Sequence, residues 1–200
     1  MDDDARDMLV LGDLTVRTAR FLDMVAGAYA FFAYGLSVPG VSMLASSISA
    51  HTGVSNPIVS SLAALAGVVL GMLLSTLVPR RARAYAARVG GGRDRRLAVA
   101  FALVFAAGFT AGAYPLYHLG LEEVSWYGGL TLALALEALL LHAAGARTAA
   151  GSFLAAFTVA AIGLPLVAVL GDETAAVAML MLAYLAGGSW TLWRASKLFE

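Results

Sequence analysis

The stretch from residue 152 to residue 170 reads SFLAAFTVAAIGLPLVAVL and contains no charged side chain. A helix rises 1.5 Å per residue, so this stretch extends over about 28 Å, close to the thickness of the bilayer hydrocarbon core. Five further stretches of similar length and apolar character accompany it. They cover residues 24–44, 58–78, 97–117, 124–144 and 174–193. The sequence therefore predicts an all-α, multi-pass membrane protein with six transmembrane helices.

The composition agrees with this prediction. The chain has 200 residues, of which 60% are hydrophobic and 13% are charged, whereas a soluble domain is about a quarter charged. We expect residues 21–200 to form a single transmembrane domain. We expect residues 1–20 to be a cytoplasmic segment, either an interfacial helix or a disordered tail. The N-terminus is acidic and its apolar run is short, so we expect no signal peptide and a first span that serves as an uncleaved anchor.

The basic residues determine the predicted orientation. In the six-span arrangement they all fall on one side of the membrane: Arg17, Arg20, the seven arginines of loop 79–96, Arg147, Arg194 and Lys197. The opposite loops carry only acidic charges: Glu122, Glu123, Asp172 and Glu173. Positive charges remain in the cytoplasm, so we expect both termini to be cytoplasmic in the cell membrane.

Aromatic residues near the predicted span ends favour the same boundaries. Tryptophan and tyrosine are enriched at the two membrane–water interfaces. Those expected to anchor the outer interface are Tyr114, Tyr117, Trp126 and Tyr127. Trp190 and Trp193 are expected to anchor the inner one.

The first span contains Pro39-Gly40, which can kink a helix or end it near Val38. The hydroxyl-rich stretch 42–55 follows it. Two interpretations stay open for this stretch. It is either a loop between the first two spans, or a re-entrant segment that enters the membrane and returns.

Glu137 is the most informative single residue, because it lies near the middle of the fourth predicted span. Ala133 lies one turn before it, whereas Leu132, Leu136 and Leu139 point in other directions. Glu137 is therefore expected to face other helices rather than lipid. An unpaired carboxylate in the membrane costs several kcal/mol, so the group is either neutral or held by a partner. Intramembrane carboxylates are often functional, and packing through a protonated Glu is the alternative.

Three polar residues are candidates for the surroundings of Glu137. Tyr184 lies at a similar depth in the sixth span and needs a hydrogen-bond partner if buried. Tyr29 lies in the first span, and His51 lies in the hydroxyl-rich stretch. The sequence thus predicts a proton, cation or substrate site made of Glu137, Tyr184, Tyr29 and His51, with hydroxyls of residues 42–61. For His51, a solvated loop histidine is the competing interpretation.

The arginines of loop 79–96 form a second candidate site. They are Arg80, Arg81, Arg83, Arg88, Arg93, Arg95 and Arg96. We expect them to bind anionic lipid headgroups or an acidic partner at the cytoplasmic face. Glycine pairs at Gly67/Gly71 and Gly108/Gly112 allow close helix packing. Packing within the bundle is favoured over a homo-oligomer or a larger complex.

What is missing narrows the function further. The chain has no cysteine, and no two histidines have helical metal-ligand spacing. Common hydrolase and metalloprotease motifs are also missing. We expect no cofactor, no metal site and no nucleic-acid partner, and the sequence does not favour an enzyme. The first hypothesis is a small transporter or channel. The alternatives are a non-catalytic membrane subunit or assembly protein, and a lipid-processing enzyme.

The predicted orientation can be tested with inserted tags in intact cells. Tags after Arg88 and after Glu200 should be protected from external reagents, because both follow basic segments. A tag between Glu122 and Glu123 should be labelled. Labelling of the Arg88 tag from outside would contradict the orientation.

Overall fold

The computed structural model describes residues 2–52, 57–90 and 95–200. Within these ranges some side chains fall outside the description, chiefly those of residues 2–7 and 57–65. The described residues form seven α-helices and one short 3₁₀ helix and contain no β-strand. They are α1 (Asp2–Thr52), α2 (Pro57–Leu77), α3 (Arg80–Gly90), α4 (Arg95–His118), η1 (Glu122–Val124), α5 (Ser125–Ala143), α6 (Arg147–Leu170) and α7 (Glu173–Ser196). The predicted all-α class is confirmed.

Five of these helices are long and apolar enough to cross a membrane, counted over the described residues. The five segments are Val10–Val41, Val99–His118, Ser125–Ala143, Arg147–Leu170 and Glu173–Ser196. The chain is thus a helical protein of multi-pass character. Helix α2 coincides with the predicted span 58–78, but much of its first half lies outside the described side chains. A total of six spans therefore stays a prediction.

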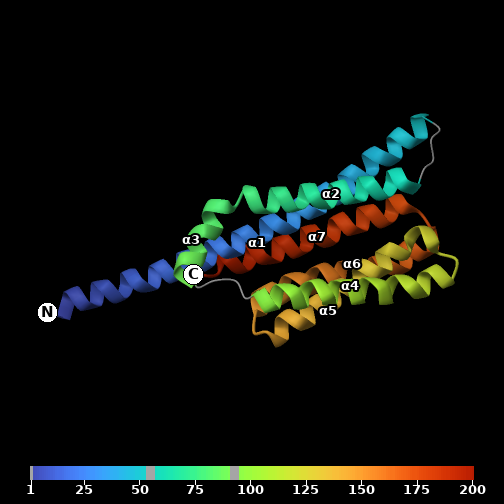
Figure 1. The fold of residues 1–200 in the computed structure, drawn as a ribbon. Helices are drawn as coiled ribbons and strands as arrows, with labels where there is room; N and C mark the ends of the chain where they lie inside the picture. Colours follow the sequence, from blue (N-terminus) through green and yellow to red (C-terminus); the bar gives the residue numbers. More distant parts are fainter. Residues whose placement is uncertain (1, 53–56, 91–94) are drawn as a thin grey trace.

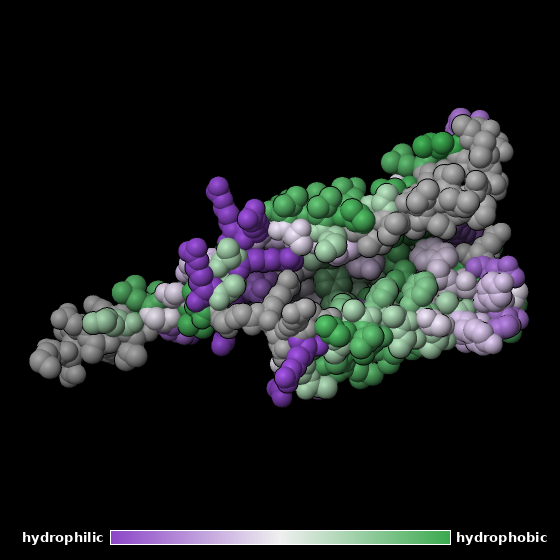
Figure 2. Space-filling view, in the orientation of Figure 1, coloured by the Kyte–Doolittle hydropathy of each residue, from purple (hydrophilic) through white to green (hydrophobic). Residues whose placement is uncertain are grey.

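The helices form a curved layer in which each contacts its neighbours. The order across the layer is α2, α1, α7, α6, α5, α4. Figure 1 shows α2 and α4 at the two edges of the layer, with α1, α7, α6 and α5 behind them. Figure 2 shows this face hollowed between α2 and α4. Successive helices alternate in direction, so the short connections join neighbours at the ends of the layer.

Helix α1 is one continuous helix of 51 residues, about 76 Å long. Of the two alternatives at Pro39-Gly40, a kink or a helix end near Val38, the helix end does not occur: α1 continues through Pro39 as far as Thr52. Residues 42–52 are therefore helical, and residues 53–56 of the predicted loop or re-entrant segment lie outside the described residues. The buried positions of α1 lie between Ala19 and Pro39. Both ends of α1 extend beyond the bundle (Figure 1).

The segment expected to be a basic loop contains a helix. Helix α3 packs on α1 next to the C-terminus (Figure 1). Ala86 is buried, whereas Arg80, Arg81 and Arg88 are exposed. The sequence contained a signal for this helix, because alanines separate the arginines and both residue types are good helix formers.

The two ends of the bundle differ in charge. The chain termini, α3 and the turn between α5 and α6 lie at one end (Figure 1). That end carries the described Arg and Lys side chains. The turns between α4 and α5 and between α6 and α7 lie at the opposite end and carry acidic residues, and hydrophilic side chains gather at both ends in Figure 2. Which end faces the cytoplasm stays a prediction.

Glycine and alanine bring the helix backbones close together. A Cβ added to Gly108 would lie 2.8 Å from the Cα atom of Ala133 on α5. One added to Gly67 would lie 2.9 Å from the Cα atom of Val38 on α1. Both glycine pairs singled out in the sequence therefore pack within the chain, as expected for bundle packing. Lipid supplies no hydrophobic drive between helices, so such contacts carry much of the packing energy.

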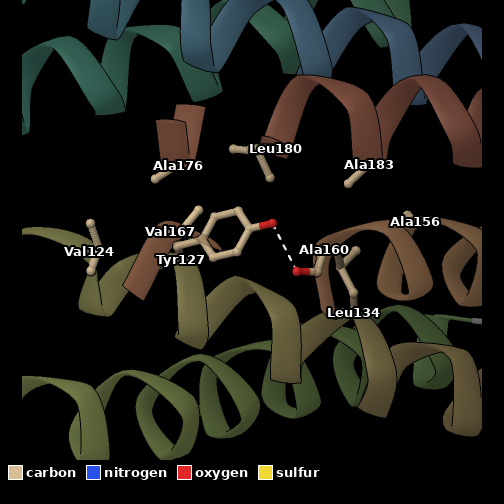
Figure 3. Close-up of a cluster of buried hydrophobic side chains, with 9 residues drawn as sticks. All are labelled: Val124, Tyr127, Leu134, Ala156, Ala160, Val167, Ala176, Leu180 and Ala183. Carbon is tan, nitrogen blue, oxygen red and sulfur yellow. Dashed lines mark hydrogen bonds between the residues drawn. The ribbon is translucent and has the colours of Figure 1, made fainter. Parts of the chain in front are cut away.

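The interior between α5, α6 and α7 is apolar. Its cluster includes Leu134, Val167, Leu180 and Ala183, together with Tyr127 (Figure 3). The Tyr127 hydroxyl donates a hydrogen bond of 2.9 Å to the carbonyl oxygen of Ala160. Tyr127 is fully buried, so the prediction that it anchors the outer interface is wrong. The hydrogen bond to α6 satisfies the polar end of a ring that the core encloses.

Gly108→Ala should lower the unfolding free energy by about 1–3 kcal/mol, because the added methyl group forces α4 and α5 apart. The matched control is Gly27→Ala, since nothing lies within 4 Å of the position that its Cβ would take. The control should be neutral or slightly stabilising. Thermal unfolding of the purified variants measures both. Equal stability of the two would contradict close packing at Gly108.

Candidate functional site

Glu137 lies on the buried face of α5. Its exposed fraction is 2%, whereas that of Leu139 on the same helix is 65%. The prediction that Glu137 faces other helices rather than lipid is therefore confirmed. Glu137 follows Ser125, the first residue of α5, by 12 positions and precedes Ala143, the last, by 6. These separations correspond to about 18 Å and about 9 Å, so the carboxyl group lies inside the apolar layer and closer to its basic end.

One oxygen of this carboxyl group has no partner. The Oε1 atom of Glu137 is buried and accepts no hydrogen bond from the residues that the structure describes. Buried polar atoms are nearly always hydrogen-bonded, because each missing bond costs free energy. An ionised carboxylate in this position costs more still. The Oε1 atom is therefore a buried hydrogen-bond acceptor that no described residue uses.

Tyr184 on α7 is the sequence-predicted residue that the structure brings to Glu137. Glu137 lies near enough to Tyr184 for a charge on one group to act on the other, and the same holds for Tyr34 on α1. Tyr184 lies close to α1, because a Cβ added to Gly35 would lie 2.5 Å from its Cβ atom. The carboxyl group thus lies near the place where α1 and α7 pack together.

The register of the helices places Phe153 at the depth of Glu137. The Tyr127 hydroxyl meets Ala160 on the antiparallel helix α6. Further along the same pair of helices, Leu134 of α5 lies beside Ala156 and Ala160 of α6 (Figure 3). Glu137 lies three residues beyond Leu134, which corresponds to about three residues back from Ala156 on the antiparallel helix α6 and places Glu137 close to the depth of Phe153.

Four rings meet at this depth, and we call them the aromatic cluster: Phe31, Phe101, Phe153 and Tyr184. The centroid of the Phe153 ring lies 5.0 Å from that of Phe31 and 5.4 Å from that of Phe101. The Phe31 and Tyr184 centroids are 6.0 Å apart. The rings come from α1, α4, α6 and α7, and each is only partly buried. Together with Glu137, the cluster joins five helices.

The other two predicted residues lie elsewhere. Tyr29 precedes Gly35 by six positions, which is about 240° around α1 from the face that meets Tyr184. His51 follows Gly35 by 16 positions, about 24 Å along the helix, and its Nδ1 atom lies 2.9 Å from the carbonyl oxygen of Ser47. The structure thus separates His51 from Glu137. Most hydroxyls of residues 42–61 lie outside the described side chains.

The arginine site is only partly described. Arg80, Arg81 and Arg88 are exposed on α3, and Arg83 and Arg96 each take part in an interaction. Arg93 and the side chain of Arg95 lie outside the description. Arg80, Arg81 and Arg88 thus share one short helix at the basic end, beside α1, whereas Arg96, which is also exposed, lies at the start of α4.

Metal ligands are not clustered in the described part of the chain. No group of three or more His, Asp or Glu side chains within it could hold a metal ion. Hydroxyl contacts do occur between helices: Ser152 and Thr191 lie 2.6 Å apart, oxygen to oxygen, across α6 and α7. Thr191 also donates a hydrogen bond to the carbonyl oxygen of Gly187. The two hydroxyls therefore have partners within the protein, which indicates a role in helix packing rather than in ligand binding.

Sequence reasoning missed the aromatic cluster. Its phenylalanines belong to apolar spans in which a Phe is expected to face lipid or pack in the core. Only the neighbour relations among α1, α4, α6 and α7 bring these rings together, and no spacing along one helix indicates them.

The fold and site define a multi-pass helical membrane protein with a buried carboxyl group. Comparisons with protein-family models, with curated proteins and with solved structures found no match for this chain. The functional argument therefore depends on the geometry around Glu137.

Proposed function

We propose that this chain is a small membrane transporter or channel in which Glu137 binds a proton or cation. The observation that supports the proposal is the buried Oε1 atom of Glu137, which has no partner among the described residues. A carboxyl group retained only for packing would normally have both oxygens hydrogen-bonded. An unused acceptor in a low-dielectric interior destabilises the fold, and a ligand that binds there offsets this cost.

The position of Glu137 suits a site that opens and closes. Its exposed fraction of 2% means that the carboxyl group is enclosed in this conformation. It lies on α5, whereas Tyr184 lies on α7 and Tyr34 on α1. Relative movement of the α4–α5–α6 group against the α1–α2–α7 group would expose it. Transporters commonly bind their substrates near the membrane midplane between parts that rock against each other.

The charge of Glu137 can be removed with little change of shape. Glu137→Gln should abolish pH-gradient-driven proton or cation flux in proteoliposomes, because the amide cannot exchange a proton. Its thermal stability should stay within about 1 kcal/mol of the wild type, because a neutral group of equal size replaces a neutral carboxyl. Glu173→Gln, at the exposed start of α7, is the matched control and should transport normally. Wild-type flux in the Glu137 variant would contradict the proposal.

A second candidate function is that of a non-catalytic subunit or assembly protein. The observation that favours it is the part of α1 that extends beyond the bundle. Met8 and Leu11 in this part have exposed fractions of 72% and 63%, and a partner in a larger complex would cover them. Wild-type behaviour of Glu137→Gln in both flux and stability would favour this candidate. A lipid-processing enzyme remains the third, with no described cluster of catalytic groups to support it.

We also propose that the end carrying α3 faces the cytoplasm and binds anionic lipids of the cell membrane. The support is the exposure of Arg80, Arg81 and Arg88 on one helix and the collection of basic residues at this end. Juxtamembrane arginines are attracted to anionic headgroups, and salt screens this attraction.

Replacing Arg80, Arg81 and Arg88 with Gln should weaken binding of the protein, held in neutral nanodiscs, to anionic vesicles. Each residue contributes about 1 kcal/mol near a charged surface at low salt. Co-flotation measures the effect, and neutral vesicles are the control. Arg194→Gln should have a smaller effect, because its guanidinium lies 5.6 Å and 5.5 Å from the ring centroids of Trp190 and Trp193. If the triple variant bound anionic vesicles as well as the wild type at low salt, the lipid-binding role would be contradicted. These arginines would then serve only to set the membrane topology.

A further inference from the structure

We propose that Glu137 and the aromatic cluster form a binding site for a hydrophobic monovalent organic cation, such as a quaternary ammonium or phosphonium ion. This inference rests on the proposed function and names the class of substrate. It follows from placing one buried, unpartnered carboxyl oxygen at the depth of four partly exposed rings. The two parts of the site recognise different properties of the same ligand.

The rings favour an organic cation over a metal ion. The face of an aromatic ring attracts a cation, and cages of several rings recognise quaternary ammonium groups. Small metal cations instead require several oxygen ligands. The described residues hold no group of three or more acidic or histidine side chains that could bind a metal ion. The surroundings therefore match a large, weakly hydrated cation.

The carboxyl group supplies the selectivity for charge. A carboxylate in an apolar interior attracts a cation and repels an anion, so it distinguishes hydrophobic ions of similar shape by the sign of their charge. No salt bridge involves Glu137 in the described part of the chain, so no protein cation competes for it. Tyr184 connects the two parts of the site, because it interacts with Glu137 and its ring lies 6.0 Å from Phe31.

The aromatic cluster is also accessible in a way that the core is not. Its rings come from α1, α4, α6 and α7 and are each partly exposed. By contrast, Tyr127 and Leu180 in the core between α5, α6 and α7 are fully buried. The hollow between α2 and α4 in Figure 2 lies on the face that these edge helices border. The proposed ligand would enter the bundle between these rings, at the depth of Glu137.

The test uses the full chain in neutral-lipid nanodiscs and radiolabelled tetraphenylphosphonium, with empty nanodiscs as the background. The wild type should bind this cation saturably and should not bind tetraphenylborate, which has nearly the same shape and the opposite charge. This comparison needs no variant, so it stands even if a substitution prevents folding. No saturable binding of the cation, or equal binding of the anion, would overturn the proposal.

Variants then locate the site. Glu137→Gln should weaken binding of the cation at least about tenfold, and Phe153→Leu about threefold to tenfold, which are changes expected from losing a buried charge and one ring. The matched control is Phe157→Leu, one turn along the same helix and packed on the same apolar core, but with no ring contact to the described members of the cluster, and it should bind like the wild type. Equal losses for the two phenylalanine variants would overturn the assignment of the cluster.

Failure of this inference can be told apart from failure of the proposed function. If tetraphenylphosphonium does not bind while flux of protons or alkali cations still requires Glu137, the ligand class is wrong and the function stands. If neither binding nor flux changes in Glu137→Gln, both are wrong.

Discussion

Close approach of helix backbones is the constraint on which the rest of this structure depends. Lipid tails are as apolar as the side chains, so no hydrophobic effect drives the helices together. Their association relies on van der Waals packing at short range. Gly108 against Ala133 and Gly67 against Val38 provide such contacts at the two edges of the layer. Gly35 against Tyr184 provides one at its centre. Because these contacts fix the register of neighbouring helices, they also fix the depth at which each polar group lies.

That register determines the chemistry around Glu137. The carboxyl group is on α5, and the side chains that give it a distinctive environment come from other helices. Tyr184 adds an electrostatic contact, and Phe153 adds a ring at the same depth. A buried acceptor without a partner destabilises a fold.

Much of the fold could be predicted from the sequence, because apolar length and helical periodicity are local properties. The burial of Glu137 and the exposure of Leu139 followed from their angles on one helix. The continuity of α1 did not follow, because Pro39 is compatible with a kink as well as with a helix end, and the sequence left both open. The burial of Tyr127 and the aromatic cluster also did not follow. Both depend on which helices are neighbours, and that information is absent from any single span.

Infrared difference spectroscopy of the Glu137 carboxyl group, recorded as a hydrophobic cation is added, tests the account most directly. In the described structure the buried group is expected to be a neutral acid, because desolvation disfavours its ionised form. The account predicts that cation binding removes the acid band and produces a carboxylate band. Glu137→Gln should abolish both changes. Cation binding to the wild type without any change in carboxyl bands would contradict the account.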